Sequence, residues 1–402
     1  MDATVVRARA DTDVVVADPM RRSRPRLVVA ALRAGAVGVL DVGSDAGGGP
    51  DGGALADTVE RILTRASGHL ALRLDAALSA AGPPDGAVAV DGIGTLVLTG
   101  PGPRAVAAWR TAWPDRRVLV EVTSRDEARA ASDAGADGVI AKGCESGGRV
   151  GDVESFVLLQ QVAGLGVPFW VQGGIGPHTA SAAVAAGAGG VVLDAQVALT
   201  RECDLDEATR RALRAMDGSE TRVVGGHRMF TRPDLPAAAL AADTPAAEVA
   251  ARLGADVRHD LVPIGQDGAM ASGLADRHVT VGGVVAAVRR QIHDQIEAAR
   301  LASPLAPGHG VARTHGTRVP VAQGPMTRVS DQAGFARAVA EGGGLPFLAL
   351  ALLRGPRCGR CSTAPPPSWA IGPGASACSA SCRRSCARSS SRPSGPCARR
   401  SR

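Results

Sequence analysis

Aromatic residues and lysine are nearly missing from this 402-residue sequence: tyrosine is absent, aromatic residues make up 2% of the chain, and Lys142 is the only lysine. A surface that stacks nucleic-acid bases on aromatic side chains is therefore not expected. No run of about eighteen apolar residues occurs, which argues against a membrane-spanning helix. The first ten residues lack the apolar core of a signal peptide. We expect a cytoplasmic protein without membrane or nucleic-acid partners.

Cysteine is scarce until the last fifty residues. Six of the eight cysteines, nine arginines and no acidic residue lie between Gly355 and Arg402, and removing these nine charges from the net charge of +6 leaves −3 on the rest. Cys358 and Cys361 form one C-x-x-C pair, but no second pair follows at zinc-finger spacing, so we expect no metal site. The Ser-, Pro- and Arg-rich composition favours disorder, or translation in a shifted frame, for residues 355–402.

Short strand-like runs alternate with amphipathic helical patterns along the first two hundred residues. Eight such units in this length predict a (β/α)₈ TIM barrel, with a doubly wound sheet as the alternative because a strand count cannot show closure. The expected strands are 14–17, 37–41, 70–74, 95–99, 118–122, 138–141, 168–171 and 190–193, and the clearest helices are 26–34, 104–113, 125–134, 153–163 and 179–186.

The remaining chain divides by composition and by an internal repeat. We assign residues 1–203 to the barrel and 204–302 to a mostly helical appendage, in which Asp206 caps a helix at 207–216 and further helices cover 237–253 and 281–301. Residues 303–312 form a linker. Residues 313–354 repeat the order strand, Pro-Met, helix, glycines, strand found at 14–40, which predicts the truncated start of a second, similar barrel.

Two glycine-rich segments, 141–151 and 171–176, directly follow expected strands and precede helical patterns. In a barrel such loops meet at the carboxyl ends of the strands, and the loops after the last two strands commonly bind phosphate. Glycines let backbone N–H groups approach an anion near a helix N-terminus. We therefore predict a phosphate cradle formed by Gly147, Gly148, Gly173, Gly174 and the eighth loop at Asp194, Ala195 and Gln196.

Residues 118–151 and 167–202 resemble the nitronate monooxygenase family, formerly called 2-nitropropane dioxygenases, which includes FMN-dependent enoyl reductases. Residues 118–151 match the family pattern of a valine strand, an alanine helix, Gly-Ala-Asp and Ala-x-Gly-x-Glu-x-Gly-Gly-x-x-Gly. Residues 167–202 match its Gly-Gly-Ile turn. The matching residues are Ser124, Ala128, Gly135, Ala136, Asp137, Ala141, Gly143, Glu145, Gly147, Gly148, Gly151, Gly173, Gly174 and Ile175.

This resemblance implies FMN at the mouth of the barrel, reduced by NADPH or NADH. It implies that Lys142 contacts the flavin N1 and C2 oxygen, where positive charge stabilises the reduced ring; the alternative is a surface lysine without a role. Relatives usually carry Gly-Thr in the eighth loop, and Asp194 in its place would repel a phosphate. The implied cofactor-binding residues are Met20, Lys142, Gly147, Gly148, Gln172, Gly173, Gly174, Asp194, Ala195 and Gln196.

Arg149 stands where the family usually has a histidine. Arginine stays protonated and is a poor general base, but it can polarise a thioester carbonyl. With Arg149 and Lys142 as the catalytic candidates, we predict reduction of an enoyl thioester. The alternatives are nitronate-type oxidation with O₂ and a catalytically silent scaffold in which Arg149 only pairs with Glu145.

The internal repeat at Gln323-Gly-Pro-Met326, together with Val150 and the long appendage, resembles the form of this domain in type I polyketide or polyunsaturated-fatty-acid synthases. That resemblance implies a carrier-bound or small-molecule acyl substrate, and other synthase domains as partners.

Overall fold

The computed structural model describes residues 12–43, 52–83 and 91–349. The expectations for the first ten residues and for residues 355–402 therefore lie outside the described part. The chain divides into two compact units, Met1–Glu297 and Ala298–Arg402.

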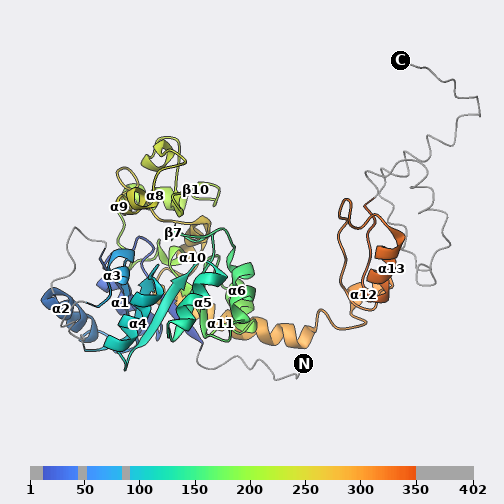
Figure 1. Cartoon of the computed structure of the whole chain (residues 1–402), viewed down its shortest axis with the longest axis horizontal. Helices are drawn as coiled ribbons and strands as arrows, with labels where there is room; N and C mark the ends of the chain where they lie inside the picture. The colour runs from blue at the N-terminus through green and yellow to red at the C-terminus, as the bar shows by residue number, and fades with distance from the viewer. Residues whose placement is uncertain (1–11, 44–51, 84–90, 350–402) are drawn as a thin grey trace, which may run out of the picture. The chain divides into compact units, whose positions relative to one another are not determined.

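The first unit contains a closed barrel of eight parallel strands, shown in Figure 1. Strand β1 pairs with β2 on one side and with β9 on the other, which closes the sheet. The TIM-barrel prediction and all eight predicted strands are confirmed, and the doubly wound alternative is wrong. The strands are β1 (Asp13–Val16), β2 (Val37–Val42), β3 (Leu70–Leu74), β4 (Ile93–Thr99), β5 (Arg117–Val122), β6 (Gly138–Lys142), β8 (Phe169–Gln172) and β9 (Gly190–Leu193).

Helices between the strands cover the outside of the barrel (Figure 1). Local sequence explains the start of the helix that follows Ser124: the Ser124 hydroxyl accepts from the Glu127 N–H, while the Glu127 carboxylate accepts from the Thr123 N–H. Such reciprocal capping satisfies N–H groups that a helix leaves unpaired. The five predicted helices are confirmed within a set of seven: α1 (Pro25–Arg33), α2 (Gly52–Leu63), α3 (Ala76–Ala81), α4 (Pro103–Ala112), α5 (Arg125–Asp133), α6 (Ser155–Ala163) and α7 (Thr179–Ala185).

The barrel interior changes from apolar to polar along each strand. One layer is apolar and buried, and includes Val39, Ala71, Leu119 and Ile140. Successive side chains of a strand alternate between its two faces, so the residue two positions later also points inward. Those next inward positions are Asp41, Arg73, Thr99, Glu121, Lys142 and Gln172. The alternation thus places a polar layer at the carboxyl ends of the strands.

The appendage adds helices and a hairpin to this unit. Its elements are α8 (Glu207–Arg214), β10 (Thr221–Val224), β11 (His227–Phe230), α9 (Ala246–Ala251), α10 (Met270–His278) and α11 (Val281–Ala302), with short 3₁₀ helices η1 (Ala195–Val197), η2 (Pro236–Ala239) and η3 (Gln266–Ala269). The predicted cap is confirmed, because Asp206 accepts from the N–H groups of Ala208 and Thr209. No helix in the described part of the chain is long and apolar enough to cross a membrane.

The predicted helix at 237–253 is wrong as a continuous element. Leu240 has an extended backbone that ends η2, and α9 begins only after Pro245. Proline disfavours helical conformation in the residue before it, here Thr244, and is itself compatible with a helix start. The alanine-rich pattern around these two breaks therefore gives two short helices.

Strands β10 and β11 form a hairpin that continues onto the sixth loop of the barrel. Gly225 and Gly226 connect them, with φ of 55° and 69°. Positive φ at both residues is the geometry of the tight two-residue turns that suit β-hairpins. Strand β11 then pairs antiparallel with β7 (Gly148–Arg149), which gives a three-stranded sheet. Backbone hydrogen bonds thereby join the appendage to the loop that carries Arg149.

The second unit contains α12 (Gly310–His315) and α13 (Ala333–Glu341) in its described part. Helix α12 begins within the segment expected to be a linker, and α13 covers the helix expected near 335–340. A single parallel bridge between Ala322 and Leu345 stands where the repeat predicts two strands. The truncated second barrel stays a prediction.

Candidate active site at the carboxyl end of the barrel

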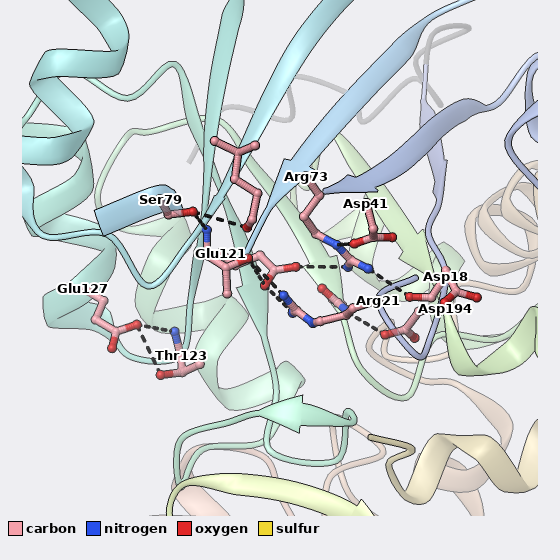
Figure 2. Close-up of polar contacts among 12 residues, drawn as sticks. Asp18, Arg21, Asp41, Arg73, Ser79, Glu121, Thr123, Glu127 and Asp194 are labelled. Carbon is pink, nitrogen blue, oxygen red and sulfur yellow. Dashed lines mark hydrogen bonds and ion pairs between the residues drawn. The ribbon is translucent and has the colours of Figure 1, made fainter. Parts of the chain in front are cut away.

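A network of buried ion pairs fills the polar layer, as Figure 2 shows. The Arg73 guanidinium lies 2.6 Å from the Asp41 carboxylate and 3.3 Å from that of Glu121. Arg21 approaches Glu121 to 2.6 Å and donates to the Thr99 hydroxyl at 3.0 Å. Buried charges persist only when partners compensate their lost hydration. The network therefore holds the side chain of Arg21 in place at the mouth of the barrel.

Burial and ion pairing shift the pKa values of the buried carboxyl groups in opposite directions. Burial raises the pKa of Asp41 despite its partner Arg73, and it raises the pKa of Asp18 to about 6 although Arg24 opposes the shift. Burial alone would also raise the pKa of Glu121, but Arg21 and other cations outweigh it and hold that pKa well below its usual range. Glu121 is thus the permanent anion of the layer.

Lys142, at the end of β6, is 1% exposed. The alternative of a surface lysine is therefore wrong. Burial, aided by the Arg21 charge, lowers the pKa of Lys142 to about 7, against the opposing influence of Glu121 and Asp194. An amine with this pKa is partly neutral at physiological pH and can both accept and donate a proton.

The seventh loop has the backbone geometry that an anion-binding turn requires. Gly173 and Gly174 have φ of 106° and 61°, a region that other residues rarely adopt. A Cβ on Gly173 would lie 2.8 Å from the Ser146 hydroxyl oxygen, so the sixth and seventh loops touch here. The Glu145 carboxylate accepts from the Ser155 N–H at the start of α6 at 3.2 Å. Glu145 therefore caps a helix.

Side-chain oxygens of the chain itself occupy the donors predicted to bind phosphate. The Gly174 N–H donates to Asp267 of η3 at 3.3 Å, and Gln196 Nε2 donates to the same carboxylate oxygen at 3.2 Å. In the eighth loop the Asp194 N–H donates to Gln196 Oε1 at 2.8 Å, and the Ala195 N–H to Asp194 Oδ1 at 2.7 Å. Asp267 was not among the residues expected from the sequence.

Three buried polar atoms around this turn have no hydrogen-bond partner among the described residues: Ser146 Oγ, Gln172 Oε1 and Asp267 Oδ1. A buried polar group without a partner costs about 1–3 kcal/mol, so such a cluster marks a place for an added polar group. The Ser146 hydroxyl can donate to a phosphate oxygen. Gly173, Gly174 and Ser146 therefore fit an FMN phosphate, provided that Asp267 yields the Gly174 N–H.

Gly147 lies where the appendage packs against the sixth loop. A Cβ at this position would lie 1.9 Å from the Pro263 carbonyl oxygen. The absent side chain thus lets the appendage pack directly on the sixth loop, and a role of Gly147 in phosphate binding stays a prediction.

A cavity of about 580 Å³ opens beside the polar layer. Its lining brings together two predicted residues, Met20 and Arg149, with Arg21, Thr99 and His227. Arg149 forms an ion pair with Glu127 of α5. The pairing of Arg149 with Glu145, which belonged to the silent-scaffold alternative, is therefore wrong.

His227, like Arg21 and Thr99, was not among the site residues expected from the sequence. The Gly225-Gly226 pair before it, flanked by valines and alternating residues, signals a hairpin and would have directed attention to the strand that follows.

A closed (β/α)₈ barrel with a polar layer, a cavity and a glycine turn at one face is the arrangement typical of TIM-barrel enzymes that bind small molecules. Residues 102–233 match the family model described as nitronate monooxygenase. This part of the chain is therefore similar to nitronate monooxygenases, as its sequence motifs indicated.

Solved structures share this fold. FabK from Thermotoga maritima has a TM-score of 0.60 at 21% identity, covering 72% of this chain and 95% of its own. A nitroalkane oxidase from Streptomyces ansochromogenes has a TM-score of 0.54 at 24% identity, covering 71% and 97%. The enoyl reductase domain of MlnA, from the macrolactin biosynthesis cluster of Bacillus amyloliquefaciens, has a TM-score of 0.52 at 11% identity, covering 71% and 96%. No curated protein matches the sequence.

Proposed function

We propose that the barrel is an FMN-dependent reductase of enoyl thioesters. The observation that carries this proposal is the position of Arg149 in the wall of the cavity. A guanidinium keeps its charge at all physiological pH values and offers five N–H donors. A side chain of this kind suits a carbonyl oxygen that gains negative charge during a reaction.

The cofactor would be held at the glycine turn. Gly173, Gly174 and Ser146 would bind the FMN phosphate, and Met20 and Lys142 would face the ring at the barrel mouth. FMN, when bound, would supply the two-electron redox chemistry. NADPH or NADH would be the reductant that restores it.

Protein groups would orient and polarise the substrate. Glu127 holds Arg149 at Nη2, which fixes the direction of the guanidinium and leaves its other N–H groups for a thioester oxygen. The buried network around Glu121 fixes Arg21 at the same wall. We further propose a carrier-bound acyl substrate, other synthase domains as partners and a location in the cytoplasm.

Purified full-length protein tests this function. It should bind FMN stoichiometrically, with the visible spectrum of an oxidised flavin, and the loaded protein should reduce a crotonyl thioester in preference to oxidising nitroethane. Arg149→Met should lower the reduction rate about 100-fold, because removal of one oxyanion donor costs about 10²–10³. Arg129→Met, at an exposed position on α5, is the matched control. A rate unchanged by Arg149→Met would reject the role of Arg149.

A silent scaffold is the second candidate, and the internal occupation of the Gly174, Asp194 and Ala195 N–H groups favours it. If it is correct, neither the wild type nor a variant without the Asp267 carboxylate will bind FMN. Nitronate oxidation is the third, and Arg149→His should increase that activity if the site lacks only a base at this position.

A further inference from the structure

His227 and Arg149 lie opposite each other in the three-stranded sheet. Strand β11 pairs antiparallel with β7, and the register matches His227 with Arg149. Directly opposite residues of antiparallel strands project to the same face, with Cβ atoms about 5 Å apart. Both side chains line the 580 Å³ cavity. The sheet therefore sets an imidazole beside a guanidinium in one wall.

The hydrogen bonding of His227 fixes which nitrogen carries the proton. Its Nδ1 lies 2.8 Å from the Gly225 carbonyl oxygen. A carbonyl oxygen only accepts, so Nδ1 holds the hydrogen and Nε2 of the neutral ring keeps a lone pair. The pairing is local, within the Gly-Gly turn, so the turn orients the ring while the register positions it.

The charges around His227 favour its neutral form. Burial lowers the pKa of His227 despite the bond to the Gly225 carbonyl, and the cations Lys142, Arg21 and Arg149 lower it further. The carboxyl groups of Asp41 and Asp75 also line the cavity. Near neutral pH the ring is therefore a base rather than an acid.

We propose that His227 is the proton-transfer residue of this cavity, acting on a carbon acid whose oxygen Arg149 binds. The substrate class is a molecule with a C–H bond next to a thioester carbonyl or a nitro group. Nε2 takes the proton from that carbon. The electron pair of the broken C–H bond moves into the adjacent carbon–carbon or carbon–nitrogen bond, and the negative charge develops on the oxygen next to Arg149. The reverse step returns the proton to carbon.

This proposal rests on the proposed function only for the placement of substrate in the cavity. Proton removal and return transfer no electrons to another molecule, so the step needs no flavin. Its test can therefore fail or succeed independently of FMN binding.

The experiment follows exchange of the α-protons of two probes, butyryl-N-acetylcysteamine and nitroethane, in D₂O by NMR. Full-length protein without added FMN should accelerate exchange of at least one probe over buffer. His227→Gln should lower the catalysed rate about 100-fold, as removal of a general base does. His259→Gln, at an exposed histidine near α9, should leave the rate unchanged.

Two further measurements separate chemistry from folding. Imidazole added to His227→Ala should restore exchange, which repair of a misfolded protein would not do. The wild-type rate should also rise with pH as the ring loses its proton, with a midpoint below pH about 6.5, the ordinary pKa of histidine.

Absence of catalysed exchange by the wild type overturns the proposal, and so does a His227→Gln rate equal to that of the wild type. If the variants do not fold, a flat pH profile of the wild type overturns it. FMN binding is titrated on the same samples. Binding of FMN without catalysed exchange rejects only the proton-transfer role of His227, whereas catalysed exchange without FMN binding rejects FMN as the cofactor.

Discussion

Replacement of Asp267 by asparagine tests whether a buried carboxylate competes with phosphate for the glycine turn. Asp267 lies in η3 and accepts from the Gly174 N–H and from Gln196 Nε2. A phosphate at this turn must displace it from Gly174. Asparagine keeps the size of the side chain and one accepting oxygen but removes the negative charge. We expect Asp267→Asn to bind FMN more tightly than the wild type.

The size of the effect follows from the two hydrogen bonds. Bonds to a charged acceptor contribute about 1.5–3 kcal/mol, and bonds to a neutral one about 0.5–1.5 kcal/mol. At 3.3 and 3.2 Å both bonds are long, so the difference is about 1 kcal/mol for each. Their sum of about 2 kcal/mol corresponds to about 30-fold in the dissociation constant. Repulsion between Asp267 and the phosphate acts in the same direction.

The assay is a fluorescence titration of FMN at several pH values. Burial, together with the charge of Asp194, raises the pKa of Asp267 well above its usual range, although the Gly174 N–H opposes this. Once the pH is low enough to protonate the wild-type side chain, the two proteins should bind FMN equally. As pH rises and Asp267 ionises, the wild type should lose affinity relative to the variant. Titration of the phosphate itself affects both proteins and cancels in the ratio.

A ratio of affinities that does not change with pH would refute competition by Asp267. The matched control is Asp243→Asn, at an exposed position of the same appendage, which should bind FMN like the wild type at every pH.

Three further predictions concern stability. Lys142→Met should stabilise the fold by about 3 kcal/mol near pH 7. The pKa of Lys142 is about 7 in the folded protein and returns to 10.5 on unfolding, so the unfolded chain binds more protons between these pH values. The stability of the wild type therefore rises with pH in this range. Urea unfolding should therefore show a smaller gain at pH about 10, and an equal gain at both pH values contradicts the buried amine. Gly173→Ala should cost about 1–3 kcal/mol more than Gly187→Ala in the same assay, since both have positive φ but only the Gly173 Cβ meets Ser146. Asp206→Ala should lower the free energy of unfolding by about 1 kcal/mol through loss of the cap on α8, and an unchanged midpoint would show that the cap contributes nothing.

The barrel could be predicted because its signal is local. Each strand is a short apolar run, and α1, α3, α4 and α5 begin at a capping side chain or a proline within the same few residues. The polar layer was also within reach of the sequence: Ile140 and Lys142, or Leu119 and Glu121, are two positions apart on strands whose inner face is otherwise apolar. Applying the two-residue period to each predicted strand would have shown that Lys142 points inward.

The rest of the site depends on contacts between distant segments. Nothing near Asp267 in the sequence indicates that its carboxylate reaches Gly174, 93 positions away. The contact of Gly147 with Pro263 is likewise set by how the appendage packs. A glycine that accommodates another backbone and a glycine that accommodates a phosphate look alike in sequence, so the packing role of Gly147 could not be predicted.

The sheet formed by β7, β10 and β11 shows that the candidate site needs residues that the barrel fold does not need. A chain that ended at residue 203 would keep all eight barrel strands and the turn at Gly173. It would lose His227 from the cavity, Asp267 from Gly174 and the strand that pairs with Arg149. Such a chain would have a complete barrel but an incomplete site. If this module were exchanged between larger proteins, the appendage would therefore have to be transferred together with the barrel.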